Sequence, residues 1–89
     1  MNQEELNRVQ EEHNKWQLNP NKGKQADLSF KDLRGLHLSG DWSGATLTDA
    51  DLTYVNFLRA DLTDADLNGA DLTYAKLKNA NLTGTGLIE

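Results

Sequence analysis

A leucine or another large apolar residue recurs at almost every fifth position through most of this 89-residue chain. The series is Leu28, Leu33, Leu38, Trp42, Leu47, Leu52, Phe57, Leu62, Leu67, Leu72, Leu77, Leu82 and Leu87. Two positions before most of these stands a small or apolar residue, usually alanine, with Asp or Asn between the two. A strict short repeat constrains the architecture strongly, because each unit must pack against its own copies. It also argues against an enzyme, since nearly every position is used for stacking.

The period of five fits neither a helix, which needs apolar residues about every 3.6 positions, nor a strand, which needs them every second position. Within each unit the two apolar residues are two positions apart, so both face the same side of an extended segment. The remaining residue must form a bend. Each unit is therefore predicted to be a short extended side followed by a corner, with the leucine and the alanine pointing inward. Such units close into coils that stack about 4.8 Å apart.

Residues 60–64, 65–69, 70–74 and 80–84 read ADLTD, ADLNG, ADLTY and ANLTG. They resemble the A-(D/N)-L-x-x unit of the pentapeptide repeat family, and the match runs from about residue 26 to residue 88. The resemblance implies an all-β solenoid, a right-handed, four-sided β-helix with four units per coil. The thirteen units would then make just over three coils, about 15 Å long. We therefore divide the chain into a capping segment, 1–25, and a β-helix, 26–89.

One irregularity interrupts the repeat, because the step from Leu38 to Trp42 is four residues instead of five. In one interpretation, the flanking glycines absorb the missing residue at a corner and Trp42 fills space inside the coil. In the other, Trp42 is turned outward as a contact residue. The sequence leaves both open, and we favour the first.

The first 25 residues do not repeat and are predicted to form a helix over 3–17 followed by a loop. Leu6, Val9, His13 and Trp16 make one apolar stripe at helical spacing. Asn2 and Glu5 resemble a capping box, and Pro20 marks the stop. We expect this helix to cap the open first coil and block edge pairing. The stripe could instead bind a partner helix.

The C-terminal end has no comparable cap. Leu82, Leu87 and Ile88 would then lie on an apolar coil end with unpaired backbone groups. Two copies could stack there as a homodimer, an arrangement that the resemblance supports. Alternatively, Gly84, Gly86 and Glu89 blunt this end. We favour the dimer slightly.

The charge is distributed unevenly along the chain. The net charge is −5, yet the first 24 residues carry four acidic and four basic residues. The remainder carries ten acidic and five basic residues, so the whole net charge lies on the repeats. There is no cysteine, no apolar run long enough to span a membrane and no signal peptide. We expect a soluble, cytoplasmic protein that does not bind membranes.

Outward-facing residues should form columns, because positions 19 or 20 apart lie on adjacent coils. One acidic column consists of Asp32, Asp51 and Asp71. A second consists of Asp41, Asp61 and Asn81, and a third contains Asp27 and Asp66. A basic patch on the remaining side is expected from Arg59, Lys76, Lys78 and His37. Tyr54 and Tyr74 are expected to stack beside the first column.

The favoured function is a non-enzymatic interaction or structural module with an unknown protein partner. Its candidate surface is Tyr54, Tyr74, Asp32, Asp51, Asp71 and Asp61. Exposed tyrosines are good binding anchors, although a ladder that only stabilises the coil stack is equally compatible. Asp and Asn also suit tight turns through local hydrogen bonds, so the acidic columns need have no other role.

The alternative is a DNA mimic that inhibits or protects DNA gyrase or another topoisomerase, which the resemblance implies for some family members. Regularly spaced carboxylates can occupy phosphate sites. However, DNA presents one charge per about 1.7 Å, so a 15 Å rod would imitate only about four or five base pairs. We predict no catalytic, cofactor or metal site and no direct binding of nucleic acid.

Overall fold

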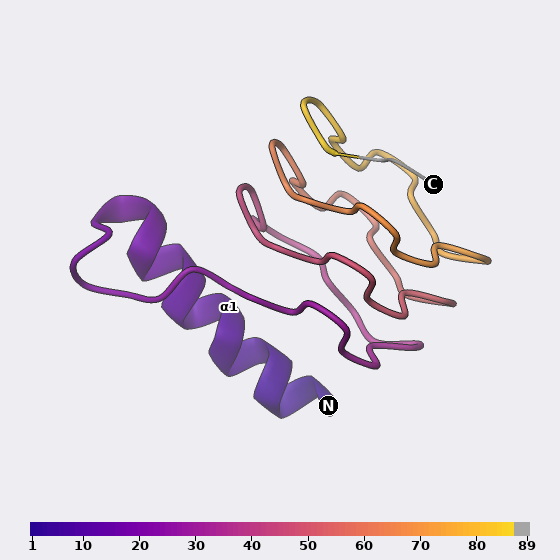
Figure 1. Ribbon diagram of the computed structural model, residues 1–89, viewed down its shortest axis with the longest axis horizontal. Coiled ribbons are helices and arrows are strands. Elements are labelled where there is room, and N and C mark those ends of the chain that lie inside the picture. The colour runs from indigo at the N-terminus through magenta and orange to yellow at the C-terminus, as the bar shows by residue number, and fades with distance from the viewer. Residues whose placement is uncertain (87–89) are drawn as a thin grey trace.

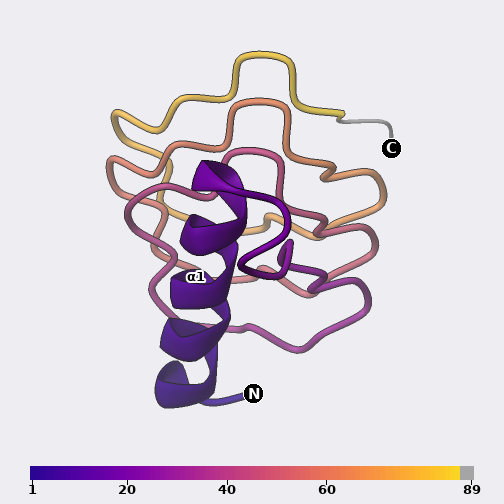
Figure 2. The ribbon, with the colours of Figure 1, turned by 90° about the vertical axis from the view of Figure 1, so that its left-hand side faces the viewer.

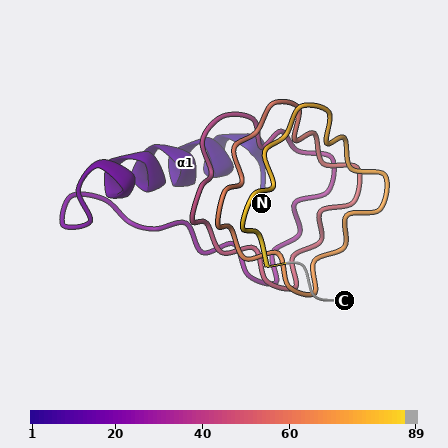
Figure 3. The same ribbon diagram turned by 90° about the horizontal axis from the view of Figure 1, so that it is seen from above.

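The computed structural model describes residues 1–86, which form one helix followed by a stack of coils (Figure 1). The helix α1 spans Gln3–Leu18. From Ala26 onward, neighbouring coils are joined by isolated parallel bridges, and within residues 1–86 none of these lengthens into a strand. Seen from above, successive coils repeat a similar outline along the stack (Figure 3).

The bridges lie in four columns, one on each side of the coil. The columns are Asp27, Thr46, Asp66 and Gly86; Asp32, Asp51 and Asp71; His37, Asn56 and Lys76; and Asp41, Asp61 and Asn81. The predicted spacing of 19 or 20 residues is therefore confirmed. The three bridges that span the irregular step between Leu38 and Trp42 join residues 19 apart, and all later bridges join residues 20 apart. The missing residue thus shortens the first coil only.

The corners are tight turns with a left-handed residue. The N–H of Val55, for example, donates to the carbonyl of Leu52 (3.1 Å), and Tyr54 between them has φ 60°. Positive φ at the third turn position is the pattern of a type II turn. The predicted bend is confirmed, but we did not predict its left-handed position. Gly, Asn and Asp at several of these positions were the available signal, because they enter this region at least cost.

The Asp or Asn that precedes most of the repeat leucines holds the following turn in place. Asp51 Oδ1 accepts hydrogen bonds from the N–H (3.1 Å) and the hydroxyl (2.8 Å) of Thr53. Asn81 Oδ1 accepts the equivalent N–H bond from Thr83 (3.0 Å). Because both Asp and Asn accept this hydrogen bond, the turn requires a side-chain oxygen and not a negative charge. The local hydrogen bonds expected at these positions are present.

The leucine and alanine positions of the first coils point inward and form one continuous core. Leu47, Leu52 and Ala45 are fully buried, and Trp42 is only 1% exposed. The inward interpretation of Trp42 is therefore confirmed, and the outward one is wrong. Within the described residues its Nε1–H has no hydrogen-bond partner. The ring fills the space at the irregular step at the cost of one unsatisfied donor.

The helix α1 lies across the N-terminal end of the stack (Figure 2). It begins with the predicted capping box between Asn2 and Glu5 and ends at Leu18, one residue later than predicted. Leu6 is fully buried in the solenoid core, and the half-buried Val9 packs against it. Because this stripe contacts the first coil, it is not free to bind a partner helix.

Polar side chains of α1 bind the backbone edge of the first coil. The Gln3 amide donates to the carbonyl of His37 (2.9 Å) and accepts from its N–H (2.9 Å), in the manner of a strand pair. The Gln10 amide donates to the carbonyl of Ser39 (2.8 Å). These contacts cover backbone groups that could otherwise pair with another chain.

His13 connects α1 to both ends of the first coil. Its Nδ1 accepts from the N–H of Ala26 (2.9 Å), and its Nε2 lies 2.8 Å from the carbonyl of Ser43. Because Ala26 is a donor, Nδ1 carries no proton and Nε2–H donates to Ser43. The fully buried ring stacks between Trp16 (5.4 Å) and Trp42 (6.0 Å). The expected role of His13 in the cap contact is confirmed.

The coils become less buried toward the C-terminal end. Leu72, Leu77 and Leu82 are half-buried, whereas the leucines at the same repeat position in the earlier coils are fully buried. Leu87 and Ile88, predicted to belong to a dimer interface, lie outside the described residues. Among residues 1–86, the helix is too short and too polar to cross a membrane.

Candidate interaction surface

Tyr54 and Tyr74 occupy the same corner of adjacent coils. The Tyr54 N–H donates to the carbonyl of Thr73 (3.1 Å), which sets the two corners in register. The ring centroids are 5.1 Å apart with an interplanar angle of 17°, so the rings stack as expected. The side chains are 62% and 73% exposed. We call this pair the tyrosine ladder.

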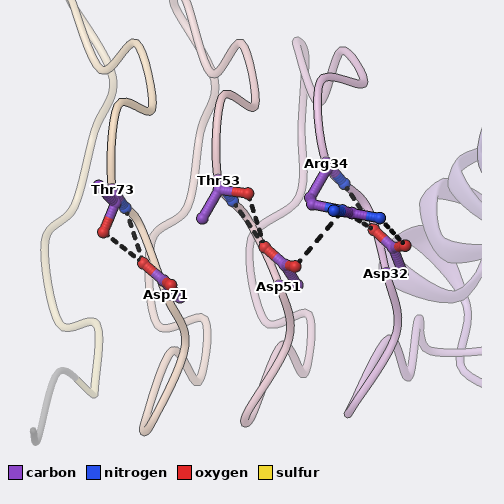
Figure 4. A network of polar contacts seen from close by, with 6 residues as sticks. All are labelled: Asp32, Arg34, Asp51, Thr53, Asp71 and Thr73. Atoms are coloured by element: carbon purple, nitrogen blue, oxygen red, sulfur yellow. Dashed lines mark hydrogen bonds and ion pairs between the residues drawn. The ribbon is translucent and has the colours of Figure 1, made fainter.

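The acidic column beside the ladder contains Asp32, Asp51 and Asp71 (Figure 4). The sequence did not indicate that Arg34 lies within it. The guanidinium donates to both carboxylate oxygens of Asp32 (3.0 and 2.9 Å) and lies 3.5 Å from Asp51 Oδ2. Two of the three carboxylates therefore share one cation, while Asp71 forms no ion pair within residues 1–86.

Hydrogen bonds hold the carboxylates of Asp32 and Asp71 in the ionised form. The Arg34 side chain, together with the Arg34 N–H, lowers the pKa of Asp32 below its usual value of 3.8. The hydroxyl and N–H of Thr73 lower the pKa of Asp71 in the same way. Charge-assisted hydrogen bonds favour the anion because protonation would weaken them. Asp32 and Asp71 are therefore held in the ionised form, and the bonds that hold them leave their oxygens only partly available to a partner.

Asp61 lies away from the other candidate acids. It belongs to the column of Asp41 and Asn81, which follows the His37 column along the coil. Of the four sides, this is the one opposite the Asp32 column. The structure therefore does not bring Asp61 together with the tyrosine ladder.

The predicted basic residues do gather on one side. Lys76 continues the column of His37 and Asn56, and the Arg59 N–H donates to the carbonyl of Lys78 (3.1 Å) at the following corner. None of Arg59, Lys76 and Lys78 forms an ion pair within the described part of the chain. The patch borders the tyrosine ladder on the side away from the acidic column.

Two further features of the first coil, Phe30 outside this surface and Gly35 within it, were not singled out from the sequence. Phe30, at the neighbouring corner of the first coil, is 77% exposed with φ 62°. Gly35 precedes Tyr54 and Tyr74 at the ladder corner. Both residues stand at the same place in their repeat units as the other residues of positive φ, so aligning the units in the sequence would have identified them as corner positions. Over residues 1–86, no group of three or more His, Cys, Asp or Glu side chains could hold a metal ion.

The family model for pentapeptide repeats matches the chain in eight copies over residues 41–69 and 60–87. No curated protein sequence matches it. Among solved structures, HetL, a pentapeptide repeat protein involved in heterocyst differentiation regulation from the cyanobacterium Nostoc sp. strain PCC 7120, is 39% identical, with a TM-score of 0.50. The similarity covers 67% of this chain and 35% of HetL.

Two other pentapeptide repeat proteins of cyanobacteria are similar to this chain. Rfr23 from Cyanothece 51142 is 31% identical over 71% of this chain and 40% of its own, with a TM-score of 0.47. The protein alr5209 from Nostoc PCC 7120 is 33% identical over 73% of this chain and 67% of its own, with a TM-score of 0.33. The chain thus spans well under half the length of HetL and Rfr23.

Proposed function

Because this chain belongs to the pentapeptide repeat family, we propose that it acts as a small, non-enzymatic protein–protein interaction module. The family implies a right-handed, four-sided β-helix, with which the four bridge columns agree. The proposed contact surface is the tyrosine ladder. The single observation that carries the proposal is that two large, exposed aromatic side chains stack on each other while both lie on left-handed backbone.

This placement is unfavourable for folding alone. Tyr54 and Tyr74 have φ 60° and 61°. An ordinary L-residue in this region costs roughly 1–2 kcal/mol, and only Gly, Asn and Asp enter it routinely. Most other corners of this solenoid use such residues, for example Gly69 and Asn79, and Phe30 and Arg59 are further exceptions. Strained positions of this kind cluster at functional sites, and exposed tyrosines are frequent anchors of protein interfaces.

DNA mimicry is supported less well by the same surface. Arg34 neutralises part of the charge of Asp32 and Asp51. One carboxylate oxygen of Asp51 is also occupied by the turn of Thr53. A rod of only a few coils carries too few free charges to imitate a long stretch of duplex DNA. A gyrase-type partner is therefore the second candidate.

The test uses the wild-type chain and three variants to capture proteins from a bacterial extract. A captured partner is then purified, and its affinity for each of the four chains is measured. The double variant Tyr54→Asn/Tyr74→Asn should lose its partner, and the control Phe30→Asn, which removes an exposed ring elsewhere, should keep it. A third variant, Asp51→Asn/Asp61→Asn/Asp71→Asn, removes charge but keeps each turn acceptor. Loss of binding in this third variant alone, together with inhibition of purified gyrase by the wild-type chain only, would favour the DNA mimic instead.

An end-to-end homodimer is part of the same proposal. The backbone N–H groups of Leu72, Leu77 and Leu82 have no backbone partner within residues 1–86. Such an edge can pair with a second copy. Light scattering over a concentration range should give twice the mass of one chain, and Leu82→Asp should restore the single mass. A wild-type mass of one chain at every concentration would rule out the dimer.

A cytoplasmic location also belongs to the proposal, and fractionation of cells that express the chain would test it.

A further inference from the structure

The tyrosine ladder lacks its first ring. Gly35 stands at the ladder corner of the first coil, and its N–H donates to the carbonyl of Thr53 (3.1 Å) in the same register as the next coil. Its φ of 72° matches those of Tyr54 and Tyr74. A Cβ placed on Gly35 would meet no atom within 4 Å. Tyr74 stacks on one face of Tyr54, and among residues 1–86 no ring lies against the opposite face, toward the first coil.

A hollow lies at this position on the surface. It is lined by Met1, Asp32, Arg34, Gly35, Thr53 and Tyr54. Tyr54 and Met1 are its apolar lining residues, and Asp32 and Arg34, which form an ion pair, are its charged ones. A flat ring and a thioether around an open space are the surroundings that an aromatic group prefers.

We propose that this hollow receives an aromatic side chain of the protein partner, which stacks on Tyr54 as the missing ring of the ladder. The proposal rests on the proposed function and deepens it by naming what the partner inserts. The ladder itself shows that rings fit at the coil spacing, since Tyr54 and Tyr74 are 5.1 Å apart. Stacked aromatic pairs favour centroid separations of about 4.5–7 Å.

The charges around the hollow favour a neutral ring over a cationic side chain. The carboxylates of Asp32 and Asp51, which could attract a cation, are already engaged by the guanidinium of Arg34. The N-terminal ammonium of Met1, which also acts on Asp32, offsets the second carboxylate, so the charges around the hollow balance and do not favour a further cation. A neutral aromatic ring leaves the ion pair intact and covers the exposed face of Tyr54.

The experiment uses the full chain with N-acetyl-L-tyrosinamide as the probe, followed by NMR of the Gly35 amide and the Met1 methyl group. We expect saturable shifts of both signals in the wild-type protein. Tyr54→Asn removes the ring on which the probe would stack and should lower the affinity for the probe by about 2- to 10-fold. Gly35→Tyr should fill the hollow with the protein's own ring and abolish the shift at Met1. The control Phe30→Asn should bind the probe as the wild type does.

Two results would overturn the inference. One is a wild-type protein whose Gly35 and Met1 signals do not respond to the probe. The other is a probe affinity that is the same in Tyr54→Asn as in the wild type, which would place the probe elsewhere. If the probe does not bind but partner capture still depends on Tyr54 and Tyr74, the proposed interaction module is supported, and only the insertion of an aromatic side chain into the hollow is refuted. If the probe binds as expected but no partner depends on the ladder, the proposed function fails and the site itself remains.

Discussion

Replacing both ladder tyrosines with asparagine should leave the protein at least as stable as the wild type while removing partner binding. Tyr54 and Tyr74 lie at φ 60° and 61°, where an ordinary residue costs roughly 1–2 kcal/mol and asparagine costs less. The stacked pair, by comparison, contributes about 0.5–1.5 kcal/mol. Each substitution relieves strain at one corner, but the stack can be lost only once.

The two effects predict a specific pattern of stabilities. With strain and stacking each taken as about 1 kcal/mol, either single variant changes the free energy of unfolding by about zero. The double variant relieves strain twice and loses the stack once, so its free energy of unfolding rises by about 1 kcal/mol. Both side chains are mostly exposed, so little buried apolar area is lost with them.

Urea denaturation, monitored by circular dichroism and by the fluorescence of Trp16 and Trp42, measures these differences. The control Tyr54→Phe/Tyr74→Phe keeps both rings and both strained corners, so its stability should equal that of the wild type. A double asparagine variant about 1 kcal/mol or more less stable than the wild type would refute the reasoning. The tyrosines would then be a ladder that stabilises the coil stack.

Three further predictions concern the solenoid and its cap. Gly23→Ala should lower the free energy of unfolding by more than the roughly 1–2 kcal/mol of a left-handed corner, because the new Cβ would overlap backbone atoms of Trp16 and Glu12 in α1. In urea denaturation, Gly35→Ala should show the backbone cost alone, and equal losses would contradict this account. His13→Ala should lower the free energy of unfolding by about 3 kcal/mol, because two backbone partners lose their hydrogen bonds and a buried ring is removed. Hydrogen exchange in α1 should become faster, and unchanged exchange would show that His13 does not hold the cap. Because the pKa of Asp71 is lowered in the folded state, its carboxylate stabilises the fold above the ordinary pKa of 3.8, and this stabilisation is lost as the pH falls below that value. Asp71→Asn should therefore flatten that part of the acid denaturation curve. A curve identical to that of the wild type would contradict this prediction.

The repeat carries most of the information about the solenoid. Each unit contacts the same position of the next coil, so one short pattern sets both the 19- or 20-residue register and the inward position of Leu52. The columns of Asp32 and Tyr54 follow directly from that register. The helix was predictable for a local reason as well, because the capping box of Asn2 and Glu5 involves neighbouring residues only.

The features that the repeat does not contain depend on contacts between parts of the chain that differ from one another. Arg34 bridges two carboxylates because its side chain reaches along one coil and across to the next, a direction that no residue pattern specifies. Trp42 turns inward because His13 and the first coil enclose it, and His13 arrives there from a helix outside the repeat. The gap at Gly35 becomes a hollow because Tyr54 on the next coil and Met1 before α1 both border it. A periodic sequence therefore predicts the periodic part of the molecule, whereas the cap, the irregular step and the candidate surface follow from packing between unlike segments.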